Sequence, residues 1–221
     1  MFRGVIFDLD GVIVDSHPLH KQAWRTFLAS VGKEASESDL DFILEGRRRR
    51  DILIHFLGEL SDSEVQEYGN KKDEFFRQAC AALNPVAGSV ECVKALHQSG
   101  FRLAVATSAS RARALWTLQQ LNLLHYFEVV VTGDDVGQSK PDPAIYRLAA
   151  QRLSLSPDGL LAVEDSVGGV HAAKLAGLRC IGIAVGQNVC SLIEAGADRV
   201  FPNLAEVSMS DLEAMAAAGG Q

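Results

Sequence analysis

Three carboxylates stand close together near the start of the chain. Asp8, Asp10 and Asp15 lie in the stretch GVIFDLDGVIVDS, beside Val, Ile and Phe residues that are typical of a buried strand. Carboxylates next to an apolar core are costly unless something compensates their charge. Acids two residues apart on an extended chain face the same way, and a strand that ends at Asp8 with a turn at Gly11 would let Asp8 and Asp10 serve one site.

Other polar side chains follow apolar runs later in the chain. Thr107 and Ser108 come at the end of the second run, and Lys140 lies in the loop GQSKPDP after the third. Glu164 and Asp165 come at the end of the fourth run. Ligands of an open parallel sheet bind outside the carboxyl ends of its strands. Carboxylates, hydroxyls and an amine are therefore predicted to meet at one edge.

This combination of groups is suited to phosphoryl transfer. Clustered carboxylates need a cation, and Mg²⁺ is usually held by one or two carboxylates together with waters and a substrate phosphate. Thr107, Ser108, Lys140 and backbone N–H groups would bind the oxygens of that phosphate. Asp8 can attack phosphorus and form an aspartyl-phosphate. Asp10 can protonate the leaving oxygen and later deprotonate a water molecule or a second hydroxyl.

The elements that must position these groups alternate after residue 100. Apolar runs predict strands at 102–108, 128–133, 160–165, 179–185 and 199–202, and the stretches between them predict helices near 110–122, 142–153, 168–177 and 188–196. Alternation of this kind is typical of βαβ units on a parallel sheet. The runs are apolar throughout, as in strands covered on both faces. The sequence predicts an α/β fold.

A helical insertion interrupts this pattern after the first strand. Helices are predicted near 17–31, 37–45, 48–58 and 61–82, and the last begins with a capping box from Ser61 to Glu64. The stretch NPVAGS at 84–89 has the Pro and Gly expected of a returning linker. We therefore expect a core of residues 1–15 and 84–221 and an all-helical domain of residues 16–83.

Composition narrows the class of protein. With 221 residues, 48% of them hydrophobic and 22% charged, the chain is typical of a globular protein. It has no apolar run of about 18 residues for a membrane span and no signal-peptide layout, so we expect a cytoplasmic location. The formal net charge of −7 disfavours nucleic acid as a partner. Four cysteines far apart predict neither a zinc site nor disulfides. A monomer is expected.

Four motifs resemble those of the haloacid dehalogenase (HAD) superfamily of phosphotransferases. They are DLDGVIVDS, Thr107 in AVATS, Lys140 in SKPDP, and VEDS, which run in the family's order over residues 5–168. The resemblance implies a Rossmann-like core with a helical cap inserted after the first motif. It also implies Mg²⁺ held by Asp8, the backbone carbonyl of Asp10 and Asp165, with Glu164 nearby. Members that cleave carbon–halogen bonds lack the second aspartate, so Asp10 points to phosphoryl transfer.

Within the superfamily the chain is most similar to the branch of β-phosphoglucomutase and small sugar-phosphate phosphatases. The resemblance assigns His20 and Trp24 in DSHPLHKQAW, and Gly46 and Arg49 in EGRRRRDIL, to the cap side of the site. A further phosphate-contacting lysine corresponds to Lys71 or Lys72.

The chain departs from the mutase at two places. Ile52 stands where the mutase has a serine three residues after the cap arginine, and SASRARA does not reproduce its Ser-Lys-Asn triplet. These departures weaken the case for the distal phosphate contacts that a bisphosphate intermediate needs.

Some residues have plainer interpretations. DLDG superficially resembles a Ca²⁺ loop, but position twelve of such a loop would be Leu19 instead of glutamate. The run Arg47–Arg50 suggests nucleic-acid binding, yet at helical spacing its members point in different directions, and only Arg49 is expected to reach a substrate phosphate. Asp15 is predicted to cap the next helix or to orient its neighbours. The remaining histidines are predicted to be ordinary surface or core residues: His17, His55, His97, His125 and His171.

The sequence therefore predicts an Mg²⁺-dependent hydrolase of a small phosphorylated metabolite, such as a sugar phosphate, acting through phospho-Asp8. The alternative is β-phosphoglucomutase. A catalytically silent phosphate-binding module is a third possibility, although the four motif residues that catalysis needs are intact: Asp8, Asp10, Lys140 and Asp165.

Overall fold

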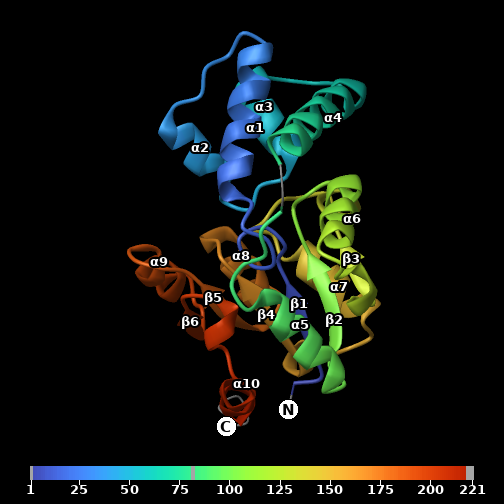
Figure 1. The fold of residues 1–221 in the computed structure, drawn as a ribbon, viewed down its shortest axis with the longest axis vertical. Helices are drawn as coiled ribbons and strands as arrows, with labels where there is room; N and C mark the ends of the chain where they lie inside the picture. Colours follow the sequence, from blue (N-terminus) through green and yellow to red (C-terminus); the bar gives the residue numbers. More distant parts are fainter. Residues whose placement is uncertain (1, 81–82, 218–221) are drawn as a thin grey trace.

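A parallel sheet forms the centre of the molecule in the computed structural model, which describes residues 2–80 and 83–217 (Figure 1). Within these residues six strands are hydrogen-bonded in the order β3-β2-β1-β4-β5-β6. The strands that the sequence predicts are all present: β1 (Gly4–Phe7), β2 (Arg102–Ala106), β3 (Val129–Val131), β4 (Leu160–Glu164), β5 (Arg179–Ile183) and β6 (Arg199–Phe201). The order places β1 at the centre, where the strand order reverses and ligands of such sheets bind.

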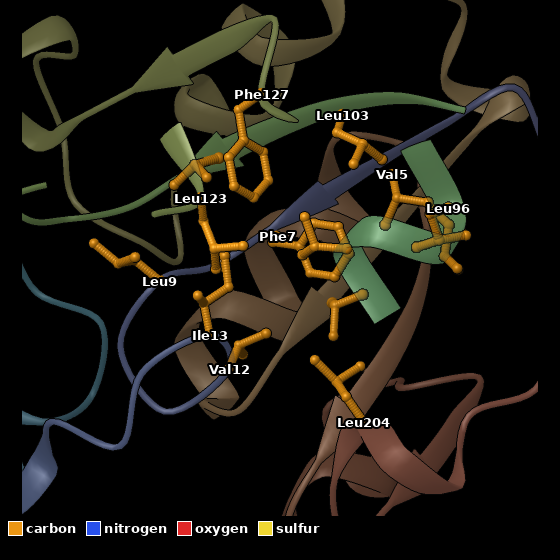
Figure 2. Close-up of a cluster of buried hydrophobic side chains, with 14 of the residues drawn as sticks. Val5, Phe7, Leu9, Val12, Ile13, Leu96, Leu103, Leu123, Phe127 and Leu204 are labelled. Carbon is orange, nitrogen blue, oxygen red and sulfur yellow. The ribbon is translucent and has the colours of Figure 1, made fainter. Parts of the chain in front are cut away.

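Helices cover both faces of the sheet. Along β1, Val5 and Phe7 point to one hydrophobic cluster and Ile6 to the other, as the two-residue period of a strand requires. Figure 2 shows Phe7 at the centre of the first cluster, between Leu96 and Phe127. The first face packs against α5 (Ser89–Gln98), α6 (Arg111–Gln120) and α10 (Met209–Ala217), and the second against α7 (Ala144–Arg152), α8 (Val167–Leu175) and α9 (Asn188–Glu194).

Two of these helices, α5 and α10, are absent from the sequence-based prediction. Short 3₁₀ turns complete the connections: η1 (Leu124–Tyr126), η2 (Gly133–Asp135), η3 (Pro157–Gly159) and η4 (Leu204–Glu206).

Four helices form a cap above the carboxyl edge of the sheet (Figure 1). They are α1 (His17–Ser30), α2 (Glu37–Ile43), α3 (Arg49–Leu57) and α4 (Asp62–Ala79). The cap has its own hydrophobic cluster around Trp24, Phe27 and Leu53. The predicted capping box of Ser61 and Glu64 begins α4, which ends before the predicted limit; residues 81–82 lie outside the described ranges. No helix in those ranges is long and apolar enough to cross a membrane.

Two hydrogen-bonded segments connect the core to the cap. The backbone N–H of Val86 donates to the Ile13 carbonyl over 3.0 Å, and that of Asp15 donates to the Asn84 carbonyl over 2.9 Å. The predicted turn occurs at Gly11, whose φ is +78°. A Cβ there would lie 1.9 Å from Oδ2 of Asp165, so the turn needs glycine for its backbone and for its space.

Helix α1 corrects one of the two alternatives predicted for Asp15, that it caps the next helix. Ser16, not Asp15, occupies the N-cap position, and its hydroxyl makes no capping bond there. That hydroxyl instead donates to Oδ1 of Asp10 over 2.6 Å. The N-cap residue of α1 therefore supports Asp10, six residues earlier in the chain.

Candidate active site

The predicted site residues converge on one cavity between the sheet edge and the cap. Asp8 follows β1, Thr107 follows β2 and Asp165 follows β4, and these three strands are neighbours. Lys140 and Glu164 are buried behind the cavity wall. The other ten predicted residues line the cavity: Asp8, Asp10, His20, Trp24, Gly46, Arg49, Lys72, Thr107, Ser108 and Asp165.

Lys140 links two buried carboxylates at the floor of the site. Its Nζ donates to Oδ1 of Asp8 over 2.6 Å, to Oε1 of Glu164 over 2.5 Å and to the Ala106 carbonyl over 3.1 Å. Glu164 is fully buried, and it also accepts from the Tyr146 hydroxyl over 2.7 Å. Burial raises the pKa of Asp8 well above its ordinary value; Lys140 opposes the rise, and the charges of Glu164 and Asp165 add to it.

The donor set at this position suits a divalent cation. Asp8, Glu164 and Asp165 each offer a carboxylate oxygen, and these oxygens lie within 4.8 Å of one another. Burial and the charge of Glu164 raise the pKa of Asp165 against the opposing effect of His17 and Lys140. Hard oxygen ligands whose charges repel one another are the environment in which Mg²⁺ binds. The residues present fit the predicted ion.

His17 is a member of this group, which corrects its assignment as an ordinary surface or core histidine. Its Nε2 lies 3.1 Å from Oδ2 of Asp165. Burial lowers the pKa of His17, but the hydrogen bond and the charge of Asp165 outweigh burial and raise that pKa to about 9. The imidazolium of His17 therefore supplies positive charge beside Asp165.

The hydroxyl residues after β2 have different partners. Thr107 is buried, and its Oγ1 accepts from the backbone N–H of Ala109 over 3.1 Å. The Ser108 hydroxyl donates to the carbonyl of Gly46, which lies in the cap loop before α3. Ser108 thus joins the cap to the core at the cavity, a contact that the predicted role in phosphate binding does not include.

Asp10 is held by hydrogen bonds from three parts of the chain. Oδ1 lies 2.6 Å from the Ser16 hydroxyl, 3.1 Å from Nε2 of His20 and 2.9 Å from Nη1 of Arg113. Oδ2 lies 2.5 Å from Nη2 of Arg113. Burial raises the pKa of Asp10, but the charge of Arg113 and the hydrogen bonds from His20 and Arg113 outweigh burial and hold it well below its ordinary value.

Lys72 connects His20 to the interior of the cap. Its Nζ lies 3.1 Å from Nδ1 of His20 and 5.4 Å from the centre of the Trp24 ring. Burial and the charge of Lys72 lower the pKa of His20 to about 3. A neutral imidazole explains both contacts, because Nδ1 can accept from the ammonium group while Nε2 donates to Asp10. Burial also lowers the pKa of Lys72 to about 8, against the charge of Asp73.

The four arginines of the run have different partners. Arg49 reaches the cavity, where Nη1 lies 3.3 Å from Oδ2 of Asp73. Arg48 is directed to Asp51 and to the carbonyl of Val136, and Arg50 is paired with exposed Asp62. Arg47 also lines the cavity, which the prediction for this run does not include.

Known proteins with similar sequences identify the family. A sequence model described as haloacid dehalogenase-like hydrolase matches residues 5–183. The chain is 38% identical over 200 residues to a phosphorylated carbohydrates phosphatase of Thermotoga maritima, covering 88% of this chain and 92% of that protein. The chain belongs to the haloacid dehalogenase-like hydrolase family.

Two further comparisons place this HAD-family chain within its family. It is 27% identical over 216 residues to β-phosphoglucomutase of Bacillus subtilis, covering 94% of this chain and 92% of that protein. Among solved structures, CbbY from Rhodobacter sphaeroides in complex with phosphate matches with a TM-score of 0.84 at 27% identity, covering 96% of this chain and 100% of that one. The protein is a HAD-type phosphatase or phosphoglucomutase, and the possibility of a silent binding module is set aside.

Besides His17 and Arg47, three further polar residues that line this HAD hydrolase's site are missing from the prediction. Arg113 lies in α6, and Ser110 is the N-cap residue of that helix. Asp73 lies in α4 of the cap. The Ser110 hydroxyl donates to Oδ2 of Asp73 over 2.8 Å, which joins core to cap. The sequence offers one signal for Arg113: SASRARA follows the second motif, so its basic residues must lie near the strand end that carries Thr107.

Proposed function

We propose that the protein is an Mg²⁺-dependent phosphatase of a small phosphorylated sugar that acts through phospho-Asp8. The observation that carries the proposal is the paired arrangement of Asp8 and Asp10. Asp8 is buried beside Lys140 and two further carboxylates, whereas Asp10 is two residues away with hydrogen-bond donors around it. This arrangement supports nucleophilic attack on phosphorus by Asp8 and proton transfer by Asp10.

In the proposed first step, a carboxylate oxygen of Asp8 attacks phosphorus and the bond from phosphorus to the ester oxygen breaks. Loss of the Arg113 contact would allow Asp10 to carry a proton, which it gives to the departing oxygen, and that oxygen leaves as an alcohol. In the second step Asp10 takes a proton from a water molecule that attacks the phosphoryl group. The bond between phosphorus and the Asp8 oxygen breaks, inorganic phosphate leaves, and both acids return to their starting forms.

The surrounding residues position and balance these two acids. Lys140 compensates Asp8 before the attack and is in place to stabilise the charge that moves onto the phosphoryl oxygens. Glu164 keeps Lys140 in position from behind. Asp8, the carbonyl of Asp10 and Asp165, with Glu164 nearby, would hold Mg²⁺. When bound, this ion would neutralise the carboxylates and polarise the phosphoryl group.

β-Phosphoglucomutase is the second candidate because similarity to the enzyme of Bacillus subtilis extends over nearly the whole chain. Arg49 is at the cavity, as the mutase requires. However, Ile52 is buried in the hydrophobic cluster of the cap and offers no hydroxyl to a distal phosphate. The phosphatase is therefore preferred.

A single assay separates the two activities. The protein is incubated with Mg²⁺ and a panel of phosphate esters that includes β-glucose 1-phosphate with a trace of the bisphosphate. Release of inorganic phosphate supports the phosphatase, whereas glucose 6-phosphate without net phosphate release supports the mutase. If no ester in the panel gives either product, both proposed activities are contradicted.

The covalent mechanism has its own test. Asp8→Asn is expected to abolish turnover, whereas Asp15→Asn, an exposed acid of the same stretch, keeps it. Added EDTA should stop the reaction, and excess Mg²⁺ should restore it. Retained activity in Asp8→Asn would refute the covalent intermediate.

A further inference from the structure

Arg113 binds both carboxylate oxygens of Asp10, the acid that transfers protons in the proposed reaction. Its guanidinium forms a two-pronged contact with Asp10, through Nη1 to Oδ1 and Nη2 to Oδ2. The side chain is 6% exposed, and the ring of Phe76 covers it at 5.3 Å. Oδ1 of Asp10 already accepts from Ser16 and His20 as well. A leaving oxygen therefore has to replace a donor, and Oδ2 has Arg113 alone.

If Arg113 is displaced from Asp10, its guanidinium needs another anionic partner. A buried guanidinium that loses its carboxylate partner is strongly unfavourable unless another anion takes that place. The nearby carboxylate is Asp73, but it is already bound by Arg49 and Ser110 and lies 3.5 Å from Nζ of Lys72. Asp73 is thus committed to other partners.

The charges on the cavity wall favour an anion from outside. Four cations line the cavity away from the Asp8 floor: Arg47, Arg49, Lys72 and Arg113. Arg49 and Lys72 are near Asp73, and Arg47 is paired with Glu45 over 3.0 Å, so Arg113 is the cation that is left without a partner if Asp10 gives it up. Nε of Arg47 is also buried without a hydrogen-bond partner among the described residues. Arginine guanidinium groups bind carboxylates and phosphates in the same forked geometry.

We propose that Arg113 is a specificity residue that exchanges Asp10 for a second anionic group on the substrate. The inference rests on the proposed phosphatase function and narrows its substrate class. The substrate is a phosphate monoester whose alcohol portion also carries a carboxylate or a second phosphate. Binding of that group by Arg113 frees Oδ2 of Asp10 to face the leaving oxygen. Substrates without it leave Arg113 on Asp10 and react slowly.

Two matched substrate pairs test the exchange. Glycerol 3-phosphate and 3-phosphoglycerate differ by a hydroxymethyl group in place of a carboxylate. Fructose 6-phosphate and fructose 1,6-bisphosphate differ by a second phosphate. Because a charge-assisted hydrogen bond contributes about 1.5–3 kcal/mol, kcat/KM is expected to favour the anionic member of at least one pair by about 10-fold to 100-fold. The pair that shows the preference identifies which anion Arg113 binds.

Variants at two arginines of the same helix separate recognition from structure. Arg113→Met should bring the two members of the preferred pair to within about threefold in kcat/KM, while Arg113→Lys should retain part of the preference. Arg111 is 56% exposed and pairs with Asp135 at 3.7 Å, so Arg111→Met is the matched control and should keep the wild-type preference.

The outcomes separate this inference from the proposed function. A wild-type enzyme that hydrolyses both members of each pair equally well overturns the role of Arg113 and leaves the phosphatase intact, whether or not any variant folds. An equal loss for both members in Arg113→Met also overturns it, because that result indicates only support of Asp10. Absence of phosphate release from every substrate overturns both proposals.

Discussion

Lys140→Met tests whether the floor of the site is held together by charge. In the native protein the Lys140 side chain is 1% exposed, and its ammonium group lies 2.6 Å from Asp8 and 2.5 Å from Glu164. Methionine keeps the length of the side chain but leaves two buried carboxylates without their cation. Removal of one partner of a buried ion pair costs about 3–5 kcal/mol. For a chain of this size each kcal/mol moves Tm by about 2–4 °C, so we expect a fall of roughly 6–20 °C.

A second substitution should return part of this loss. Glu164→Gln in the Lys140→Met background removes one of the stranded charges, and it is expected to restore about 1–3 kcal/mol of the free energy of unfolding. Activity stays absent, because Asp8 still lacks Lys140. Urea unfolding monitored by tryptophan fluorescence in EDTA gives the three stabilities without a divalent cation that would replace the lost charge.

The pH dependence of Lys140→Met follows from the same reasoning. Burial already raises the pKa of Asp8 in the native protein, and loss of Lys140 removes the main opposing charge. A carboxyl whose folded-state pKa is raised loses stability as pH rises from its unfolded value toward its folded value. The difference from wild type should therefore shrink as pH falls from 8 to 5. A difference independent of pH, or a double variant less stable than Lys140→Met alone, would refute the charge argument.

Three further predictions concern Asp10, His17 and the N-cap residue of helix α4, Ser61. Asp10→Asn should lower kcat by about 10²-fold or more, as expected for loss of general acid–base catalysis, and an undiminished rate of phosphate release would rule out that role. His17, with its pKa raised from 6.5 to about 9, should stabilise the fold below pH 6.5 and lose that contribution as pH rises through about 9; NMR titration of its ring carbons checks the value. Ser61→Ala should cost about 1 kcal/mol by removing the cap of α4, measured by thermal unfolding.

Most of the fold is readable from the sequence because its signals are local. The strands are continuous apolar runs, and their alternation with helical stretches along the chain favours parallel pairing. The acids at the end of β1 and the glycine after them predict a turn, and the structure confirms it at Gly11. Helix α5 was missed because the Pro and Gly of 84–89 point to a linker, although Val93 and Leu96 lie three residues apart on its buried face.

The partners of the site residues are a property of tertiary structure. Periodicity predicts a helix over Arg113, but it does not say that the side chain reaches Asp10, 103 residues earlier in the chain. The same is true of Asp73, which meets Ser110 of the core only because the cap closes over the sheet edge. Ser16 shows a local rule that fails: it occupies an N-cap position, yet its hydroxyl is used by Asp10. A hydrogen bond to an ionised carboxylate is stronger than one between neutral groups, which explains why the Ser16 hydroxyl is directed to Asp10.

The contacts of Asp10 link the position of the cap to the proton-transfer step. Ser16 belongs to the connection, His20 to the cap and Arg113 to the core, and all three bind the same carboxylate. Movement of the cap away from the sheet would withdraw His20 together with Lys72, while Arg113 would remain. Asp10 would then be left with the partner that holds both its oxygens. On the proposed mechanism, proton transfer by Asp10 would therefore require a closed cap and a substrate that occupies Arg113, and solvent alone would supply neither.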